Sequence, residues 1–345
     1  MSMGSRNRVK LLFTPGLDVE FVDRGRAIQQ VEEIAGEGTR FPIVVFGPEG
    51  CGKTAWLKQS VEILKELDFD VIYIDPVRKD YVAYTDVRGI VDRLSEAAAE
   101  AIGVAQVKLA TLAIDLVKEL LSRWGKRKIA ILVDDVFQAI GLDKAEIYVK
   151  SLLGLIEYPP ASYEKIIAIV VTSEGITRER IGRHRWAELR AMWNMSREGF
   201  EELYEQIRKR TSGSIPGFED VWMLIGGNPG ILAQLYRASW DINAVTTTLI
   251  EDRKLTSSFI NKWRHWLEEA IRDPDILWSA DTPKELVNEL KARNLIIYNM
   301  HSRIKIRWID QPPPERDPEL GISRYTAWQT PLHREAVRRA VEEYK

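Results

Sequence analysis

The chain has 345 residues, of which 45% are hydrophobic and 29% charged, and its formal net charge is -2. This composition excludes a wholly disordered chain, and the near balance of charge excludes a general polyanion binder. A single cysteine excludes an intrachain disulfide, and no apolar run approaches the roughly 18 residues of a membrane span. We therefore expect a cytoplasmic, globular protein of two or three domains, at about 150 residues per domain.

Five apolar runs in the first part of the chain predict strands, at 42–46, 71–74, 129–133, 166–171 and, more weakly, 191–195. Uninterrupted apolar runs of this length are typical of strands that are buried on both faces of a parallel sheet. Helical patterns separate them, at 53–67, 87–102, 107–124 and 144–156. The alternation indicates an α/β core with a parallel sheet at residues 1–195. Ligands of such sheets bind beyond the carboxyl ends of the strands, so the polar residues there are candidate site residues.

From residue 196 onward the pattern becomes helical. A helix is predicted at 196–210, because Ser196 precedes an apolar-periodic face. The segment 218–241 predicts two helices that flank a Gly-Gly-Asn-Pro-Gly turn, and helical character continues to about residue 271. We assign 196–272 to a second, helical domain.

The last segment, 273–345, mixes helices and strands. A helix is predicted at 283–293, strands at 295–300 and 303–309, and a closing helix at 331–344, after the proline-rich loop 311–317. A helix, a two-stranded ribbon and a second helix in this order resemble a winged-helix module.

One motif indicates a specific chemistry. Residues 47–54 read Gly-Pro-Glu-Gly-Cys-Gly-Lys-Thr and match G-x-x-x-x-G-K-[ST] between a predicted strand and a predicted helix. Such a loop surrounds a phosphate with its backbone N–H groups, Lys53 neutralises β- and γ-phosphate charge, and Thr54 ligates Mg²⁺. The predicted nucleotide contacts are Gly47, Pro48, Glu49, Gly50, Cys51, Gly52, Lys53, Thr54 and Ala55.

A phosphate loop of this kind works with an acid at the end of another strand. Asp134 and Asp135 follow the run 129–133, and we expect Asp134 to hold Mg²⁺ and Asp135 to orient or deprotonate the attacking water. The alternative for this pair is an acidic cap of the next helix. Asp75 also ends a strand, but Pro76 follows it, which favours a turn residue.

Two further candidates follow the fourth strand. Ser173 could sense the γ-phosphate or position the water, although a hydroxyl that initiates a turn is an equal alternative. Arg183 lies in a basic cluster at 178–190 and is a candidate arginine finger, in cis or from a neighbouring subunit. The alternative for the cluster is a solvated helix face, or a patch that is paired with Glu179 and Glu188.

These motifs together resemble the archaeal signal-transduction ATPases with numerous domains, the STAND class within AAA+, over roughly residues 18–240. Residues 133–135 resemble the Walker B motif of that class, 171–173 its sensor strand, and 181–183 its Gly-Arg element.

Two other segments extend this resemblance. Residues 21–24 resemble a Phe-Val-Gly-Arg box that contacts adenine, which implies that Arg24 belongs to the nucleotide site. Residues 227–232 resemble the Gly-x-Pro motif of a helical lid, which implies that Pro229 packs near adenine and reports the nucleotide state. The resemblance also implies specificity for ATP, a mobile lid at 196–272 and a C-terminal winged helix.

We therefore predict a Mg²⁺-dependent ATPase that hydrolyses ATP slowly to ADP and phosphate and acts as a nucleotide-controlled switch. Its expected partner is a protein, or a second copy, at the lid or the winged helix. One alternative is a DNA-binding loader resembling archaeal origin-recognition ATPases, and another is a regulatory scaffold that binds ATP with little turnover.

The charge of the C-terminal part tests the DNA alternative. Residues 251–345 contain 17 Lys and Arg against 16 Asp and Glu, which is no electrostatic footprint for nucleic acid. In the predicted strand 303–309, Arg303, Lys305 and Arg307 would share one face. Such a basic wing could touch phosphates, and a solvated strand face is the alternative.

Overall fold

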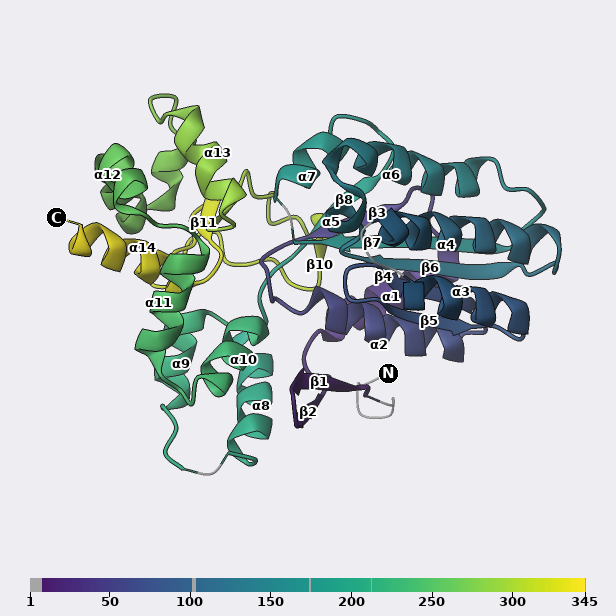
Figure 1. Ribbon diagram of the computed structural model, residues 1–345, viewed down its shortest axis with the longest axis horizontal. Coiled ribbons are helices and arrows are strands. Elements are labelled where there is room, and N and C mark those ends of the chain that lie inside the picture. The colour runs from purple at the N-terminus through teal and green to yellow at the C-terminus, as the bar shows by residue number, and fades with distance from the viewer. Residues whose placement is uncertain (1–7, 101–103, 174, 212, 345) are drawn as a thin grey trace. The chain divides into compact units, whose positions relative to one another are not determined.

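The computed structural model describes residues 8–100, 104–173, 175–211 and 213–344 (Figure 1). The chain divides into two compact units. The first unit combines the described part of Met1–Arg24 with Gly47–Gly52 and Ala191–Lys345, and the second unit combines Gly25–Phe46 with Lys53–Arg190. The boundaries predicted at residues 195 and 272 remain predictions.

The second unit is built on a mostly parallel sheet (Figure 1). Its strands are β3 (Ile43–Phe46), β4 (Asp70–Asp75), β5 (Asp80–Tyr84), β6 (Lys128–Asp134), β7 (Lys165–Thr172) and the start of β8 (Glu188–Met192), in the order β8-β3-β7-β6-β4-β5. β3, β7, β6 and β4 pair in parallel, so the predicted α/β class with a parallel core is confirmed.

Two details of this sheet differ from the prediction. β5 lies antiparallel to β4 at the sheet edge and was not predicted. Its side chains are only half buried, because an edge strand has one neighbour, so it lacks the continuous apolar run of the central strands. The weak strand predicted at 191–195 begins earlier and is β8, Glu188–Met192.

Helices cover both faces of the sheet, which is why its central strands are uniformly apolar. The helices are α1 (Gly25–Glu37), α2 (Lys53–Glu66), α3 (Arg88–Glu100), α4 (Val104–Ser122), α5 (Val136–Ile140), α6 (Leu142–Glu157) and α7 (Gly175–Ile181). One core joins the strands to α3, α4 and α6 through residues such as Ile131, Leu94, Leu116 and Leu152. α1 and α2 pack on each other, and the Trp56 indole donates to the Ala27 carbonyl at 3.4 Å.

The first unit is mainly helical. Its elements are the hairpin β1 (Lys10–Thr14) and β2 (Leu17–Glu20), the helices α8 (Arg197–Arg208), α9 (Phe218–Ile225), α10 (Pro229–Arg237), α11 (Ile242–Asp252), α12 (Ser257–Arg272), α13 (Lys284–Ala292) and α14 (Pro331–Glu343), and the 3-10 turn η2 (Pro274–Trp278). The predicted helix start is confirmed, since Ser196 caps α8 by accepting the Gly199 N–H. Residues from the hairpin and from both predicted C-terminal domains share one hydrophobic core, including Leu17, Phe200 and Leu332.

The second predicted strand of the C-terminal ribbon is wrong. Residues 305–307 form a 3-10 turn, η3 (Lys305–Arg307), followed by a short strand β10 (Trp308–Ile309) that pairs in parallel with Ala191 and Met192 of β8. The antiparallel partner of β9 (Ile296–Tyr298) is β11 (Thr326–Trp328). The alternation of apolar and basic residues misled the prediction, because Ile304 and Ile306 are 63% and 64% exposed and cover no core.

The predicted basic face is wrong for the same reason. Arg303 is half buried and donates to the carbonyls of Pro314 and Ser323, each at 3.2 Å, so its guanidinium is engaged within the fold. Lys305 and Arg307 lie in the 3-10 turn rather than on a strand.

Among the helices that the structure describes, none is long and apolar enough to cross a membrane.

Candidate functional site

The carboxyl ends of the central strands meet at one edge of the second unit. By register, Phe46 at the end of β3 lies opposite Thr172 at the end of β7, and Asp134 at the end of β6 lies opposite Val171. Asp75 ends the neighbouring strand β4. This is the edge at which open α/β sheets bind ligands.

α2 begins with the two residues to which the sequence assigned phosphate and metal binding. Lys53 is 5% exposed and opens the helix, and Thr54 follows it. The N–H groups of the first helical turn have no acceptor within a helix, and the helix dipole favours an anion there. The local fold therefore provides donors and positive potential where the motif predicts phosphate. Ala55 lies in the same turn.

Asp134 is 1% exposed and has two polar neighbours. The Thr54 hydroxyl hydrogen-bonds its carboxylate, and the Tyr73 hydroxyl donates to Oδ2 at 3.3 Å. Burial, followed by the negative charge of Asp135, raises the pKa of Asp134 to about 7. A cation at this position would remove the penalty of the buried charge.

Asp135 has a left-handed backbone, with φ of 42° and ψ of 28°. It occupies the N-cap position of α5, as the alternative interpretation predicted, but its side chain makes no capping hydrogen bond. Its N–H donates to the Val171 carbonyl at 3.1 Å, which holds it beside β7. A non-glycine residue in this region carries strain that is common at functional sites.

Two further residues lie at this edge of the sheet. The sequence favoured a turn role for Asp75 and assigned no role to Arg78. Asp75 is 1% exposed, and burial raises its pKa. Its Oδ1 accepts the N–H of Arg78 at 2.9 Å, and Arg78 Nη1 lies 3.4 Å from the Thr54 hydroxyl. The strand end was a usable signal for Asp75. Arg78 belongs to no motif and is placed by the turn between β4 and β5.

These residues fit a magnesium ion that is bound mainly by a nucleotide. In the described part of the chain, no group of three or more His, Cys, Asp and Glu could hold a metal ion. Mg²⁺ with a nucleotide takes only one or two protein ligands and fills its remaining positions with phosphate oxygens and water. Thr54 and Asp134 match that limited set. The buried Oδ2 of Asp75 accepts no hydrogen bond from the described residues and lies 3.6 Å from the Arg78 guanidinium.

Ser173 and Arg183 differ in their exposure to solvent. Ser173 is half buried directly after β7, while Arg183 is exposed in the turn after α7. Within the basic cluster, Arg180 pairs with Asp143 at 2.7 Å. Pairing of this kind agrees with the solvated-face alternative for Arg180. The roles predicted for Ser173 and Arg183 remain predictions.

The phosphate loop Gly47–Gly52 belongs to the first unit, where neighbouring atoms leave no room for a side chain at Gly47 or Gly50. A Cβ on Gly47 would lie 1.9 Å from the Met192 carbonyl oxygen. A Cβ on Gly50 would lie 2.8 Å from Asn228 Oδ1 and 2.9 Å from Gly230 Cα. Gly230 also donates its N–H to the Gly50 carbonyl at 3.0 Å. The Gly-Gly-Asn-Pro-Gly turn therefore packs directly on the loop.

Buried amide side chains extend this contact. Asn228 Nδ2 donates to the Glu49 carbonyl at 2.9 Å and to Asn194 Oδ1 at 2.8 Å. The N–H of Glu49 donates to Gln329 Oε1 at 2.7 Å, and Asn194 Nδ2 donates to the Gln329 carbonyl at 3.0 Å. No sequence pattern marks Asn194 or Gln329. Pro229 is the first residue of α10 beside this network, and its contact with adenine remains a prediction.

The side chain of Glu49 is held as well. Arg253 forms an ion pair with its Oε2 at 2.7 Å, and Asn294 donates to the same oxygen at 3.0 Å. Pro48 and Cys51 are buried, and the Cys51 N–H donates to the Pro48 carbonyl at 3.3 Å. The loop is thus fixed from residues 253, 294 and 329, far along the sequence.

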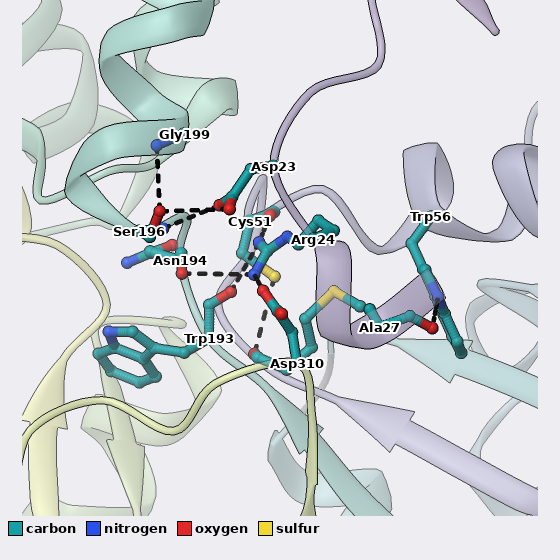
Figure 2. A network of polar contacts seen from close by, with 11 residues as sticks. Asp23, Arg24, Ala27, Cys51, Trp56, Trp193, Asn194, Ser196, Gly199 and Asp310 are labelled. Atoms are coloured by element: carbon teal, nitrogen blue, oxygen red, sulfur yellow. Dashed lines mark hydrogen bonds and ion pairs between the residues drawn. The ribbon is translucent and has the colours of Figure 1, made fainter. Parts of the chain in front are cut away.

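Arg24 is 3% exposed and points into protein acceptors (Figure 2). Nη2 donates to the carbonyls of Cys51 at 2.6 Å and Trp193 at 2.8 Å, and Nη1 pairs with Asp310 Oδ2 at 3.1 Å. Asp23 beside it accepts the Ser196 N–H at 3.0 Å. Arg24 therefore ties the phosphate loop to residues 193 and 310, and its contact with adenine remains a prediction.

A glycine-rich loop that leads into a Lys-Thr helix start, beside an acid at the end of a parallel strand, defines a P-loop nucleoside triphosphatase fold. Residues 21–235 match the family model described as an ATPase domain predominantly from Archaea. The chain belongs to this family.

Similar solved structures include the Walker-type ATPase PabY2304 of Pyrococcus abyssi, with 14% identity, 92% and 96% of the two chains covered, and a TM-score of 0.43. A mutant RuvB of Thermotoga maritima has 12% identity, coverage of 75% of this chain and 81% of its own, and a TM-score of 0.40. AMPPCP-bound DnaA from Aquifex aeolicus has 14% identity, coverage of 77% and 75%, and a TM-score of 0.34. No curated protein matches the chain. Likenesses this distant add neither activity nor partner.

Proposed function

We propose that the protein binds ATP with Mg²⁺ and hydrolyses it to ADP and phosphate as a nucleotide-controlled switch. The observation that carries this proposal is the hydrogen bond between the Thr54 hydroxyl, at the start of α2, and the buried carboxylate of Asp134, at the end of β6. It unites the two residue types that orient magnesium in P-loop enzymes. Membership of the archaeal ATPase-domain family supports ATP as the nucleotide.

Each residue has a distinct part in this proposal. Lys53 neutralises phosphate charge, and the N–H groups of the loop and of the first turn of α2 donate to phosphate oxygens. Thr54 and Asp134 would hold Mg²⁺, which when bound neutralises phosphate charge and favours attack by water. Asp135 orients that water, and Ser173 and Arg183 are secondary candidates at the same reaction.

The contacts of the phosphate loop within the first unit support the switch role. The Gly50 carbonyl is bonded by Gly230 of the lid motif, and Glu49 is held by Arg253 and by Asn294 of the last segment. A nucleotide that rearranges this loop would alter those contacts. We propose that α13, β9, β11 and α14 form a winged-helix-like module, and that it or the lid carries a protein partner or a second copy.

The first prediction concerns Lys53. Lys53→Ala should weaken ATP binding at least tenfold, about 1.4 kcal/mol, because one buried cation facing the phosphates is lost. Binding is measured by titration with a fluorescent ATP analogue. Lys65→Ala is the matched control, since Lys65 lies in the last turn of the same helix and pairs with Glu62 at 2.8 Å outside the motif. Equal affinity of the two variants would contradict nucleotide binding at this loop.

The second prediction concerns Asp135. Asp135→Ala should lower turnover at least tenfold while ATP binding stays near that of the wild type, because its proposed role is confined to the attacking water. Phosphate release is measured with Mg²⁺, with and without duplex DNA at moderate salt. Unchanged turnover would favour the scaffold alternative. Stimulation by DNA would favour the loader alternative.

A further inference from the structure

The turn between β4 and β5 brings a positive charge to the metal-binding threonine. Arg78 lies in this four-residue turn, between the paired strand ends Asp75 and Asp80. Its Nη1 is 3.4 Å from the Thr54 hydroxyl and 3.6 Å from Asp75 Oδ2. The guanidinium thus contacts Thr54, one of the two proposed protein ligands of Mg²⁺. It also contacts Asp75, a buried acid on the strand next to that of Asp134, the other proposed ligand.

The turn is built to present this side chain. The N–H of Arg78 donates to Asp75 Oδ1 at 2.9 Å, which closes the turn on the strand end. Lys79 has a left-handed backbone with φ of 58°, which brings the chain back into β5. The far side of the turn is anchored to α2 by the ion pair of Asp80 with Lys58. The position of Arg78 therefore follows from the hairpin.

The contact of Arg78 is replaceable. The guanidinium side chain is 60% exposed, whereas the Asp75 side chain is 1% exposed. Ion pairs in which one partner is solvated are weak, and a divalent cation carries twice the charge of an arginine. A cation that arrives with a nucleotide can displace Arg78 without unfolding any part of the turn.

We propose that Arg78 is a positioning residue that occupies the cation position at Thr54 until a divalent metal displaces it. This inference rests on the proposed function, because it assigns the metal to Thr54 and Asp134. Arg78 neutralises Asp75 and Asp134 in the metal-free chain and competes with Mg²⁺ for the same place. It thereby sets the metal concentration at which the site is filled.

The test uses Mn²⁺ as the probe and the full chain. Free Mn²⁺ is followed by electron paramagnetic resonance in titrations of the wild type and of Arg78→Gln, with and without ADP. We expect Arg78→Gln to bind Mn²⁺ at least threefold more tightly, because a competing cation is gone. Arg78→Gln should also have a lower Tm than the wild type in EDTA and a larger rise in Tm with Mn²⁺. Without Arg78, the buried carboxylates of Asp75 and Asp134 depend on the metal for a counter-charge.

The neighbouring lysine supplies a matched control. Lys79→Gln removes the same charge from the same turn and should leave Mn²⁺ affinity within twofold of the wild type, whereas Arg78→Lys should lie between the wild type and Arg78→Gln. Equal affinities of Arg78→Gln and Lys79→Gln would overturn the inference, because the effect would then be one of net charge. If the wild type binds ATP and Mn²⁺ but Arg78→Gln has the same Mn²⁺ affinity as the wild type, the inference about Arg78 is overturned and the proposed function is not. Loss of both bindings in the wild type would overturn the proposed function as well.

Discussion

Replacing Asp310 by alanine should lower the free energy of unfolding by about 3–5 kcal/mol, the usual cost of leaving one partner of a buried ion pair without its counter-charge. The side chains of Arg24 and Asp310 are 3% and 7% exposed, and their charged atoms lie 3.1 Å apart. Arginine side chains are not deprotonated in proteins, so the variant keeps an unpaired buried charge. Urea unfolding, with the midpoint and the m-value fitted separately, measures the change.

Two further variants show whether the loss comes from the unpaired charge. In the double variant Arg24→Met, Asp310→Leu neither position carries a buried charge, so it should recover a large part of the stability. Glu285→Ala removes the exposed partner of Lys262, whose atoms lie 2.8 Å apart with exposures of 49% and 66%. That pair should contribute no more than about 1 kcal/mol. A loss in Asp310→Ala as small as that of Glu285→Ala would show that the Arg24 pair is not buried in solution.

Acid should destabilise the protein through His333, by about 2 kcal/mol between pH 7 and pH 5 from this residue alone, at about 1.4 kcal/mol per pH unit below its unfolded pKa. Burial, followed by the positive charge of Arg253, lowers the pKa of His333 from 6.5 to about 3, and Glu49 opposes the shift. The ring is 1% exposed, with Nδ1 2.8 Å from the Thr330 hydroxyl. Between these two pKa values the unfolded chain binds a proton that the folded chain does not.

The contribution of the neutral His333 ring to the free energy of unfolding is fully present above pH 6.5. It is lost as the pH falls toward 3, because protonation then favours the unfolded state. His333→Gln removes the titrating ring. Between pH 7 and pH 5 the free energy of unfolding of this variant should therefore fall by about 2 kcal/mol less than that of the wild type. Urea unfolding at several pH values measures the slope, which does not depend on any constant loss from the substitution. His265→Gln, at an exposed position, should keep the wild-type slope. Identical slopes in the two variants would contradict the assignment.

The central strands could be predicted because their physical cause is local. Ile129–Val133 and Ile166–Val171 are apolar throughout, since helices cover both faces of the sheet, and β3 (Ile43–Phe46) has the same composition for the same reason. The strands β5 and β10 do not carry this signal. β5 is half buried, and β10 consists of only Trp308 and Ile309, whose partner lies more than 100 residues earlier in β8.

The motif residues of the site were predictable for a similar reason. Gly47 to Thr54 are contiguous, so the sequence by itself determined that a phosphate loop leads into a helix N-terminus, and with it the ATPase class. Asp134 and Asp135 were found because a charged pair follows a buried strand. Their strand is the neighbour of β7, and only the register shows this.

Only the tertiary structure decided which side chains hold the phosphate loop and which side chain faces the proposed metal position at Thr54. Arg24 with Asp310, and Gln329 with Glu49, are pairs separated by 286 and 280 residues, and no local pattern distinguishes these side chains from solvated ones. Arg78 reaches Thr54 because a hairpin turn folds back on α2. Spacing along the chain determines which groups a loop or helix presents, whereas burial and pairing between distant segments depend on packing, which has no period in the sequence.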